Sequence, residues 1–259
     1  MRRILLSALL AATVSACGSK YTSLTGNLKL GQSAEENYQR GLVELKEKNY
    51  PEATRFFEYV KSKYPFSKYS GLADLRLADV KFAQDRYTEA AEAYQQFGQL
   101  HPTSEEVDYA EYRAGLSHFK AAPGDFVLFP PAHEKDQREA EKALEILTDL
   151  VKTRPDSKLL PEAKKTLADV QARLAAREWY VGEYYFKRSR WAGAAGRYAT
   201  LVEKYPGSSH EEEALFKMAR SYAALDERFR ARQALQQLIA KHPESPQRPE
   251  AEKLLASLR

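Results

Sequence analysis

The residues that most often carry chemistry in proteins are few and scattered in this chain. His101 and His242 each directly precede a proline, and the other three histidines, His118, His133 and His210, have no partner at metal-ligand spacing. The sequence contains no HExxH, no GxSxG and no phosphate-binding glycine loop. Carboxylates are abundant, but on amphipathic helices they usually form a solvated face. The sequence therefore predicts a binding protein, not an enzyme, with no metal and no cofactor.

The only cysteine, Cys17, follows an export signal. Arg2 and Arg3 precede an apolar run over residues 4–14 that is too short to span a bilayer. The order Val-Ser-Ala-Cys over residues 14–17 resembles the lipobox of bacterial lipoproteins, in which the cysteine sulfur is diacylated and the new N-terminal amine is then acylated. We therefore expect residues 1–16 to be removed and Cys17 to carry a diacylglycerol and an N-acyl chain such as palmitate. The alternative is an ordinary signal peptide with a chance cysteine.

Three acyl chains would make the anchor effectively permanent, because a single chain gives only marginal binding and each buried CH₂ adds about 0.8 kcal/mol. In the lipoprotein class, aspartate after the lipidated cysteine favours inner-membrane retention. Gly18 occupies that position in this chain, so we expect the protein to be anchored at the periplasmic face of the outer membrane. Residues 17–32 lack apolar periodicity and are predicted to form a tether of at most roughly 50 Å.

Charge gives no reason to expect a nucleic-acid partner. The formal net charge of the whole chain is +4. Without Arg2 and Arg3 it is +2, from 38 basic and 36 acidic residues, and the two signs are interleaved.

Five proline–serine pairs mark an internal repeat. Each proline follows an apolar helical stretch, and we expect the serine two residues later to cap the next helix. Twelve residues before each proline stands an alanine, and a bulky residue follows four positions after it on the same helical face. A small residue lies on the preceding helix of each unit. This arrangement is the tetratricopeptide pattern of small, small, large and proline. The five sets are Gly41, Ala53, Phe57, Pro65; Ala78, Ala90, Tyr94, Pro102; Gly115, Ala143, Leu147, Pro155; Gly182, Ala194, Tyr198, Pro206; and Ala219, Ala231, Leu235, Pro243.

The pattern predicts an all-α, tetratricopeptide-type solenoid over residues 33–259. Prolines interrupt the third unit between Lys120 and Gln137, whereas the fourth unit has one long helix from about Pro161 to Arg188. The apolar run 126–129 within the interruption is either exposed to solvent or folded back into the groove of the solenoid, and we favour the second arrangement. The predicted units are residues 33–67, 68–104, 105–157, 158–208 and 209–245, with a capping helix over 249–258.

Aromatic residues crowd the first turn between repeats. Tyr38, Tyr59, Tyr64, Phe66 and Tyr69 occur near Lys63 and Lys68. Most aromatic residues in repeats serve packing. An aromatic pocket rimmed by lysines would, however, suit a peptide that ends in an aromatic residue and a carboxylate. We therefore predict peptide binding by Tyr38, Tyr64, Phe66, Tyr69, Lys63 and Lys68.

The chain resembles the BamD (ComL) family, the tetratricopeptide lipoproteins of the outer-membrane β-barrel assembly machinery. The resemblance rests on the lipobox, on Lys-Tyr-Pro-Phe-Ser at 63–67, on Asp-Tyr at 108–109 with Tyr112, Arg113, Gly115 and Leu116, and above all on Glu-Trp-Tyr-Val-Gly-Glu-Tyr-Tyr at 178–185 followed by Trp191. It implies a scaffold that receives the C-terminal signals of unfolded outer-membrane proteins and contacts a BamA-type insertase, outer-membrane lipid and accessory lipoproteins of the machinery. It also implies that the insertase docks near Trp191, Arg197 and Phe229.

Rival interpretations are tetratricopeptide lipoproteins that act as scaffolds for pilus assembly or that coordinate cell-wall synthesis. The first would not be expected to carry the stretch from Glu183 to Trp191, and the second would more often bring a coiled-coil segment.

Overall fold

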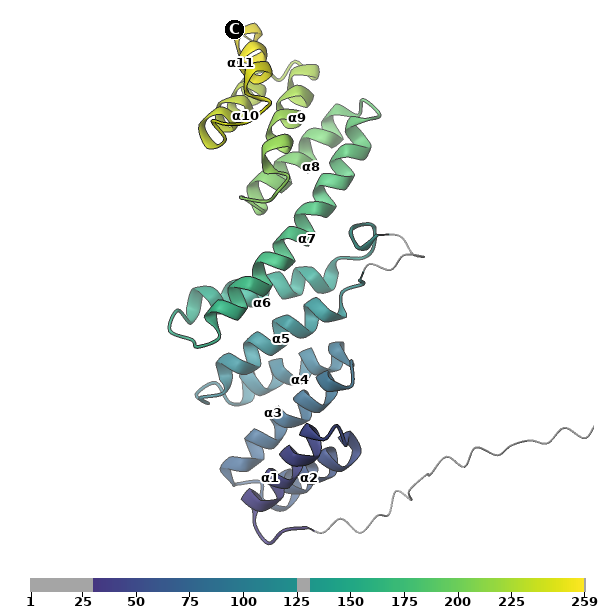
Figure 1. The fold of residues 1–259 in the computed structure, drawn as a ribbon, viewed down its shortest axis with the longest axis vertical. Helices are drawn as coiled ribbons and strands as arrows, with labels where there is room; N and C mark the ends of the chain where they lie inside the picture. The colour runs from purple at the N-terminus through teal and green to yellow at the C-terminus, as the bar shows by residue number, and fades with distance from the viewer. Residues whose placement is uncertain (1–29, 125–130, 259) are drawn as a thin grey trace, which may run out of the picture.

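The computed structural model describes residues 30–124 and 131–258. Within these ranges the chain forms eleven α-helices and one short 3-10 helix, with no β-strand. The helices stack in chain order into an elongated body, with α1 at one end and α11 at the other (Figure 1). The expected signal peptide, Cys17 and most of the expected tether lie outside the described residues.

Ten helices form five pairs of consecutive helices, and the eleventh covers the C-terminal end of the stack. The predicted all-α solenoid of five tetratricopeptide-type repeats with a capping helix is therefore confirmed. The pairs are α1 (Ala34–Lys46) with α2 (Tyr50–Lys63), α3 (Lys68–Ala83) with α4 (Tyr87–Leu100), α5 (Val107–Ala121) with α6 (Arg138–Thr153), α7 (Leu160–Phe186) with α8 (Trp191–Lys204), and α9 (Glu211–Ala224) with α10 (Arg228–Lys241); the cap is α11 (Arg248–Ser257).

The small and large repeat residues hold each pair together. The five alanines and the five bulky residues of the second helices are all completely buried. A Cβ atom added to Gly41 would lie 2.6 Å from the Phe57 ring, and one added to Gly182 would lie 2.6 Å from the Tyr198 ring. The small residue of the first helix therefore makes room for the large residue of the second, as the sequence pattern predicts.

The turns between repeats begin with the expected prolines, but the serines behave differently from the prediction. Of the five serines that follow the repeat prolines, only Ser67 is the N-cap residue of a helix. Its hydroxyl accepts a hydrogen bond from the backbone N–H of Tyr69. The hydroxyls of Ser104, Ser157 and Ser245 also accept from the second residue beyond them, but helical geometry begins one residue later still. The Ser208 hydroxyl has no partner among the described residues. These four serines open a turn ahead of the helix instead of capping it.

The interruption of the third repeat lies between α5 and α6 and contains the 3-10 helix, Ala132–Glu134. Two arginines of α7 hold its ends: Arg173 donates to the Pro123 carbonyl at 2.6 Å, and Arg177 donates to the His133 carbonyl at 2.7 Å. The apolar run 126–129 lies outside the described residues, so both interpretations of it stay open.

The long helix α7 joins the two halves of the solenoid. It has 27 residues, close to the predicted extent, and it contacts α5 and α6 of the third repeat as well as α8 and α9 of the following repeats. Figure 1 shows it as the rod between the lower and upper parts of the stack. A partner bound to one half is thus physically connected to the other half through one helix.

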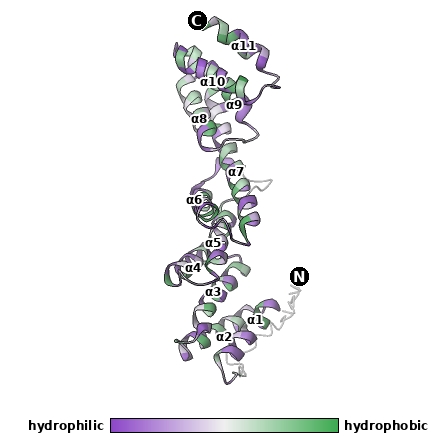
Figure 2. Ribbon diagram, turned by 90° about the vertical axis from the view of Figure 1, so that its left-hand side faces the viewer, coloured by the Kyte–Doolittle hydropathy of each residue, from purple (hydrophilic) through white to green (hydrophobic). Residues whose placement is uncertain are grey.

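The first helices of several neighbouring repeats also contact one another: α1 with α3, α5 with α7, and α7 with α9. The second helices approach one another less closely, which leaves clefts between them. Hydrophilic and hydrophobic residues alternate along the helices in Figure 2. Within residues 30–124 and 131–258, no helix is long and apolar enough to cross a membrane.

Candidate binding surfaces

The aromatic residues predicted to form one peptide pocket occupy different environments. Tyr38 is buried in the core of the first repeat, where its ring centroid lies 5.8 Å from that of Phe57 and 5.4 Å from that of Tyr69. Its hydroxyl accepts a hydrogen bond of 3.0 Å from Nε of Arg76. Tyr38 therefore supports the fold of the first two repeats and does not line an open surface.

The other members of this group surround the α2–α3 turn. Tyr64 is half-buried, packs edge-on against Tyr59 and donates a hydrogen bond of 3.2 Å to the carbonyl of Gln32. Phe66 is completely exposed at the tip of the turn, and Lys63 and Lys68 are exposed on either side of it. Phe66 and the two lysines thus lie on an exposed turn, whereas Tyr69 packs against the buried Tyr38 and has Nζ of Lys68 5.1 Å from its ring centroid.

A polar network between α3, α4 and α5 was not predicted from the sequence. Its centre is Asp79, which is almost fully buried and accepts hydrogen bonds from the Tyr94 hydroxyl at 2.5 Å, the Tyr109 hydroxyl at 2.7 Å and Nη1 of Arg76 at 2.7 Å. Burial and the Asp79 charge raise the pKa of both tyrosines, so both hydroxyls stay protonated as donors. The network fills the space between the first helices of repeats two and three.

Arg113 completes this network from α5. Its guanidinium carbon lies 3.7 Å from the centroid of the Phe82 ring, and its Nε donates to the Tyr94 hydroxyl at 3.2 Å. Burial opposes the positive charge, but Tyr94, Tyr109 and Asp79 outweigh it and hold the pKa of Arg113 above its ordinary value. Arg113 is therefore a permanently charged group in a fixed orientation.

An equivalent network occurs two repeats later. Glu183 of α7 accepts hydrogen bonds of 2.6 Å from the Tyr198 hydroxyl and from Nζ of Lys217 on α9. Burial would raise the pKa of Glu183, but the bonds from Lys217 and Tyr198 hold it below its usual value. Asp79 and Glu183 each directly follow the small residue on the first helix of their repeat. Arg113 and Lys217 each stand two positions before the small residue on the first helix of the following repeat. A signal was present, because an acid follows the small residue only in the two repeats whose bulky residue is tyrosine.

The residues expected to dock a partner lie on two helices of the C-terminal half. Trp191 is half-buried at the start of α8 and packs edge-on against Phe186, with ring centroids 5.3 Å apart. Arg197, farther along α8, forms an ion pair of 3.2 Å with Glu178 of α7, and 46% of its side chain is exposed. Phe229 at the start of α10 is 72% exposed. Trp191 is thus a packing residue with one accessible side, whereas Arg197 and Phe229 are open to solvent.

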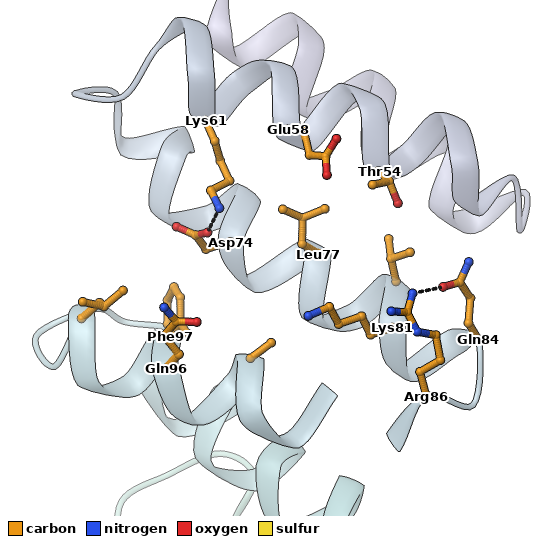
Figure 3. Close-up of a pocket in the computed structure, with 13 residues that line it drawn as sticks. Thr54, Glu58, Lys61, Asp74, Leu77, Lys81, Gln84, Arg86, Gln96 and Phe97 are labelled. Carbon is orange, nitrogen blue, oxygen red and sulfur yellow. Dashed lines mark hydrogen bonds and ion pairs between the residues drawn. The ribbon is translucent and has the colours of Figure 1, made fainter. Parts of the chain in front are cut away.

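Helices α2, α3 and α4 form a cleft with a volume of about 340 Å³. Figure 3 shows the residues that line it. Leu77 and Phe97 contribute apolar surface, and Lys61 and Asp74 form an ion pair of 2.5 Å across one end. Arg86 donates to Gln84 at the other end. Lys61 and Asp74 thus neutralise each other at one end of the cleft, whereas Glu58 and Lys81 also line it.

Polar groups suited to catalysis are few. His118 is 3% exposed, and its Nδ1 lies 2.7 Å from a carboxylate oxygen of Glu139. Such burial keeps a substrate away from the imidazole. No group of three histidine, cysteine, aspartate or glutamate side chains in residues 30–124 and 131–258 is arranged to hold a metal ion.

The start of α1 is held by a buried asparagine that was also not predicted. The Asn37 side chain accepts a hydrogen bond of 2.8 Å from the Gly31 N–H and donates to the carbonyls of Gly31 at 3.0 Å and Ser33 at 2.7 Å. The Asn37 side chain therefore fixes the backbone at Gly31, fourteen positions after Cys17.

Comparisons with known proteins identify a family and several relatives. A family model described as "YfiO: Outer membrane lipoprotein" matches residues 31–236. The protein "Outer membrane protein assembly factor BamD" of Neisseria gonorrhoeae is 28% identical over 255 residues, covering 95% of this chain and 93% of that protein. The protein of the same name from Pasteurella multocida is 29% identical over 212 residues, covering 79% and 80%. Among solved structures, the "TPR2AB-domain:pHSP90-complex of yeast Sti1" is similar with a TM-score of 0.41 and 16% identity, covering 87% of this chain and 82% of that one.

Proposed function

The chain belongs to the YfiO family of outer membrane lipoproteins, and from this premise we propose that it is a lipid-anchored scaffold of the machinery that assembles outer-membrane β-barrels. The observation that carries the proposal is the extent of the match to proteins named outer membrane protein assembly factor, which covers nearly the whole of both chains. An assembly factor must hold several proteins at once, and an elongated solenoid presents a large surface for doing so.

The proposed scaffold has two working ends. Its N-terminal repeats receive the C-terminal signal of an unfolded outer-membrane protein, and its C-terminal repeats dock a BamA-type insertase. The exposed Phe66 between Lys63 and Lys68 supports the first role, because it offers apolar and cationic contacts on one turn. The exposed Arg197 and Phe229 support the second. Accessory lipoproteins of the machinery are further expected partners.

The lipid anchor is proposed to be Cys17, through a diacylglycerol and an N-acyl chain. Since Asn37 holds Gly31, the free tether would extend from Cys17 to about Leu30. A fully extended chain spans at most about 3.3–3.6 Å per residue, so such a tether would let the solenoid reach roughly 50 Å from the periplasmic face of the outer membrane.

We further propose that the protein is not an enzyme. In its strongest arrays of polar side chains, the carboxylates of Asp79 and Glu183 are occupied by hydrogen bonds from neighbouring helices. Binding energy in such a protein serves to bring partners together and not to lower a chemical barrier.

Controlled depletion tests the proposal. Loss of the protein in its host should lower the amounts of folded β-barrel proteins in the outer membrane, and expression of the wild-type chain should restore them. The Cys17→Ser variant should restore them poorly because it lacks the anchor. Normal barrel levels combined with loss of pili or of cell-wall integrity would instead support a scaffold for pilus assembly or cell-wall synthesis.

A further inference from the structure

We propose that Arg113 binds the C-terminal carboxylate of an unfolded outer-membrane protein. The inference rests on the proposed function, since it names the group that would read the end of the substrate chain. It is carried by the geometry of Arg113, by its charge balance and by a comparison with the equivalent position two repeats later.

The guanidinium of Arg113 is held in place but keeps most of its donors free. The Phe82 ring lies 3.7 Å from its guanidinium carbon, and the Tyr94 hydroxyl accepts from its Nε. Nη1 and Nη2 donate to no residue within 30–124 and 131–258. Their four N–H groups form the flat fork that matches the two oxygens of a carboxylate. One fifth of the Arg113 side chain is exposed to solvent.

Arg113 also lacks a carboxylate of its own. In the described part of the chain the only acid within ion-pair distance is Asp79, whose Oδ1 lies 4.0 Å from Nε. Asp79 already accepts hydrogen bonds from Arg76, Tyr94 and Tyr109. A partly buried cation that shares a distant carboxylate with three other donors gains more from a ligand anion than a surface lysine does.

The same repeat position in the C-terminal half provides the contrast. Lys217 forms ion pairs of 2.6 Å with Glu183 and 2.8 Å with Glu213, so two carboxylates compensate its single charge. The two networks share their architecture, yet Lys217 has two carboxylates at close range, whereas the nearest carboxylate oxygen to Arg113 lies 4.0 Å away. Structural support of the repeats therefore does not require the open donors of Arg113.

The surroundings favour a chain end over an acidic side chain. Arg113 is recessed between α3 and α5, and a terminal carboxylate can enter such a place because no chain continues beyond it. The half-buried rings of Phe82 and Tyr109 lie beside its guanidinium, and the Tyr87 ring packs against Phe82 with centroids 5.1 Å apart. These rings suit a terminal residue that is aromatic.

Peptide binding to the lipidated full chain in detergent micelles tests the inference. Three fluorescent peptides of about ten residues, the length of a barrel strand, carry the same alternating sequence. The first ends in phenylalanine with a free carboxylate, the second is its amide, and the third is the amide with aspartate as the penultimate residue. Fluorescence anisotropy gives the affinity of each. Since hydrogen bonds to a charged group contribute about 1.5–3 kcal/mol, we expect the free acid to bind about 10- to 100-fold more tightly than the amide.

The variants assign that preference to a residue. Arg113→Gln should remove it, Arg113→Lys should keep part of it, and the matched control Lys217→Gln should keep it entirely. If Arg113→Gln fails to fold, the acid-over-amide preference measured for Arg113→Lys and for the wild type with the three peptides still tests the inference. Equal binding of acid and amide, persistence of the preference in Arg113→Gln, or full rescue by the aspartate peptide would each overturn the inference while leaving the proposed function intact. Failure of all three peptides to bind the wild type would instead count against signal recognition itself.

Discussion

The hydroxyl of Tyr198 donates a hydrogen bond of 2.6 Å to Glu183, which also accepts from Lys217 of the next repeat. One tyrosine thus links the two helices of its own pair to the first helix of the pair that follows. Asp79 and Tyr94 repeat this arrangement in the N-terminal half. The hydrogen bonds of Tyr94 and Tyr198 thus join neighbouring helices in the two repeats whose bulky core residue is a tyrosine.

Removal of the Tyr198 hydroxyl should therefore weaken the C-terminal half. Tyr198→Phe leaves the largely buried Glu183 with one donor fewer, and we expect a loss of about 1–2 kcal/mol. Urea denaturation followed by circular dichroism measures it. The control is Tyr112→Phe, because that hydroxyl has no hydrogen-bond partner in the described residues; its effect should stay within about 0.5 kcal/mol. Equal effects of the two substitutions would contradict the assigned role of the link.

Two glycines of adjacent helices should respond in opposite ways to substitution by alanine. In Gly182→Ala the new Cβ would lie 2.6 Å from the buried Tyr198 ring, so we expect a loss of about 1–3 kcal/mol from overpacking. In Gly196→Ala the Cβ meets nothing within 4 Å, and the variant should gain about 0.5–1 kcal/mol of helix stability. Thermal melting compares the two. A Gly182→Ala protein as stable as Gly196→Ala would show that α7 and α8 pack less closely than described.

Stability should fall in acid partly through Glu211. Burial would raise the pKa of this carboxyl, but Lys241 and the Gly207 N–H, at 2.8 and 2.7 Å, hold it below its ordinary value. A lowered folded-state pKa stabilises the protein above the unfolded value of about 4.3 and loses this contribution as pH falls through the folded pKa. Glu211→Gln should thus be less stable than wild type at pH 7, and the difference should shrink at about pH 3. Urea midpoints that differ equally at both pH values would contradict this assignment.

A charge exchange tests the docking role proposed for Arg197. This residue already pairs with Glu178, so Arg197→Glu both removes a cation and places two carboxylates together. The double variant Arg197→Glu with Glu178→Arg keeps an internal pair but reverses its orientation. If a partner carboxylate binds Arg197, both variants should retain less insertase in a pull-down. Recovery of binding in the double variant would assign only a structural role to the pair, and unchanged binding in both would remove Arg197 from the docking surface.

The helix pairs could be predicted from the sequence because their determinants are local. A proline ends each second helix, and the small and large residues that pack together recur at fixed distances from it. The extent of α7 follows in the same way from the absence of a proline inside it. The structure adds a further regularity, because an alanine stands eight residues after each of the five prolines and is completely buried. These residues are Ala73, Ala110, Ala163, Ala214 and Ala251.

The side chains that join one repeat to the next could not be predicted so well. Asp79, Tyr109 and Arg113 meet only because α3 and α5 lie at a particular distance, and that distance depends on packing across three helices. Tyr38 was predicted to line the same pocket as Tyr64 and Phe66 of the α2–α3 turn, yet α1 turns it into the core. The sequence identified aromatic residues of the N-terminal repeats but not the direction in which each side chain points.

Affinity purification of the lipidated protein from detergent-solubilised outer membranes tests the central claim most directly. Mass spectrometry should identify acyl chains on Cys17 and, in the co-purified material, a β-barrel insertase with periplasmic domains. A protein recovered without lipid, or a lipidated protein recovered without any β-barrel partner, would contradict the account.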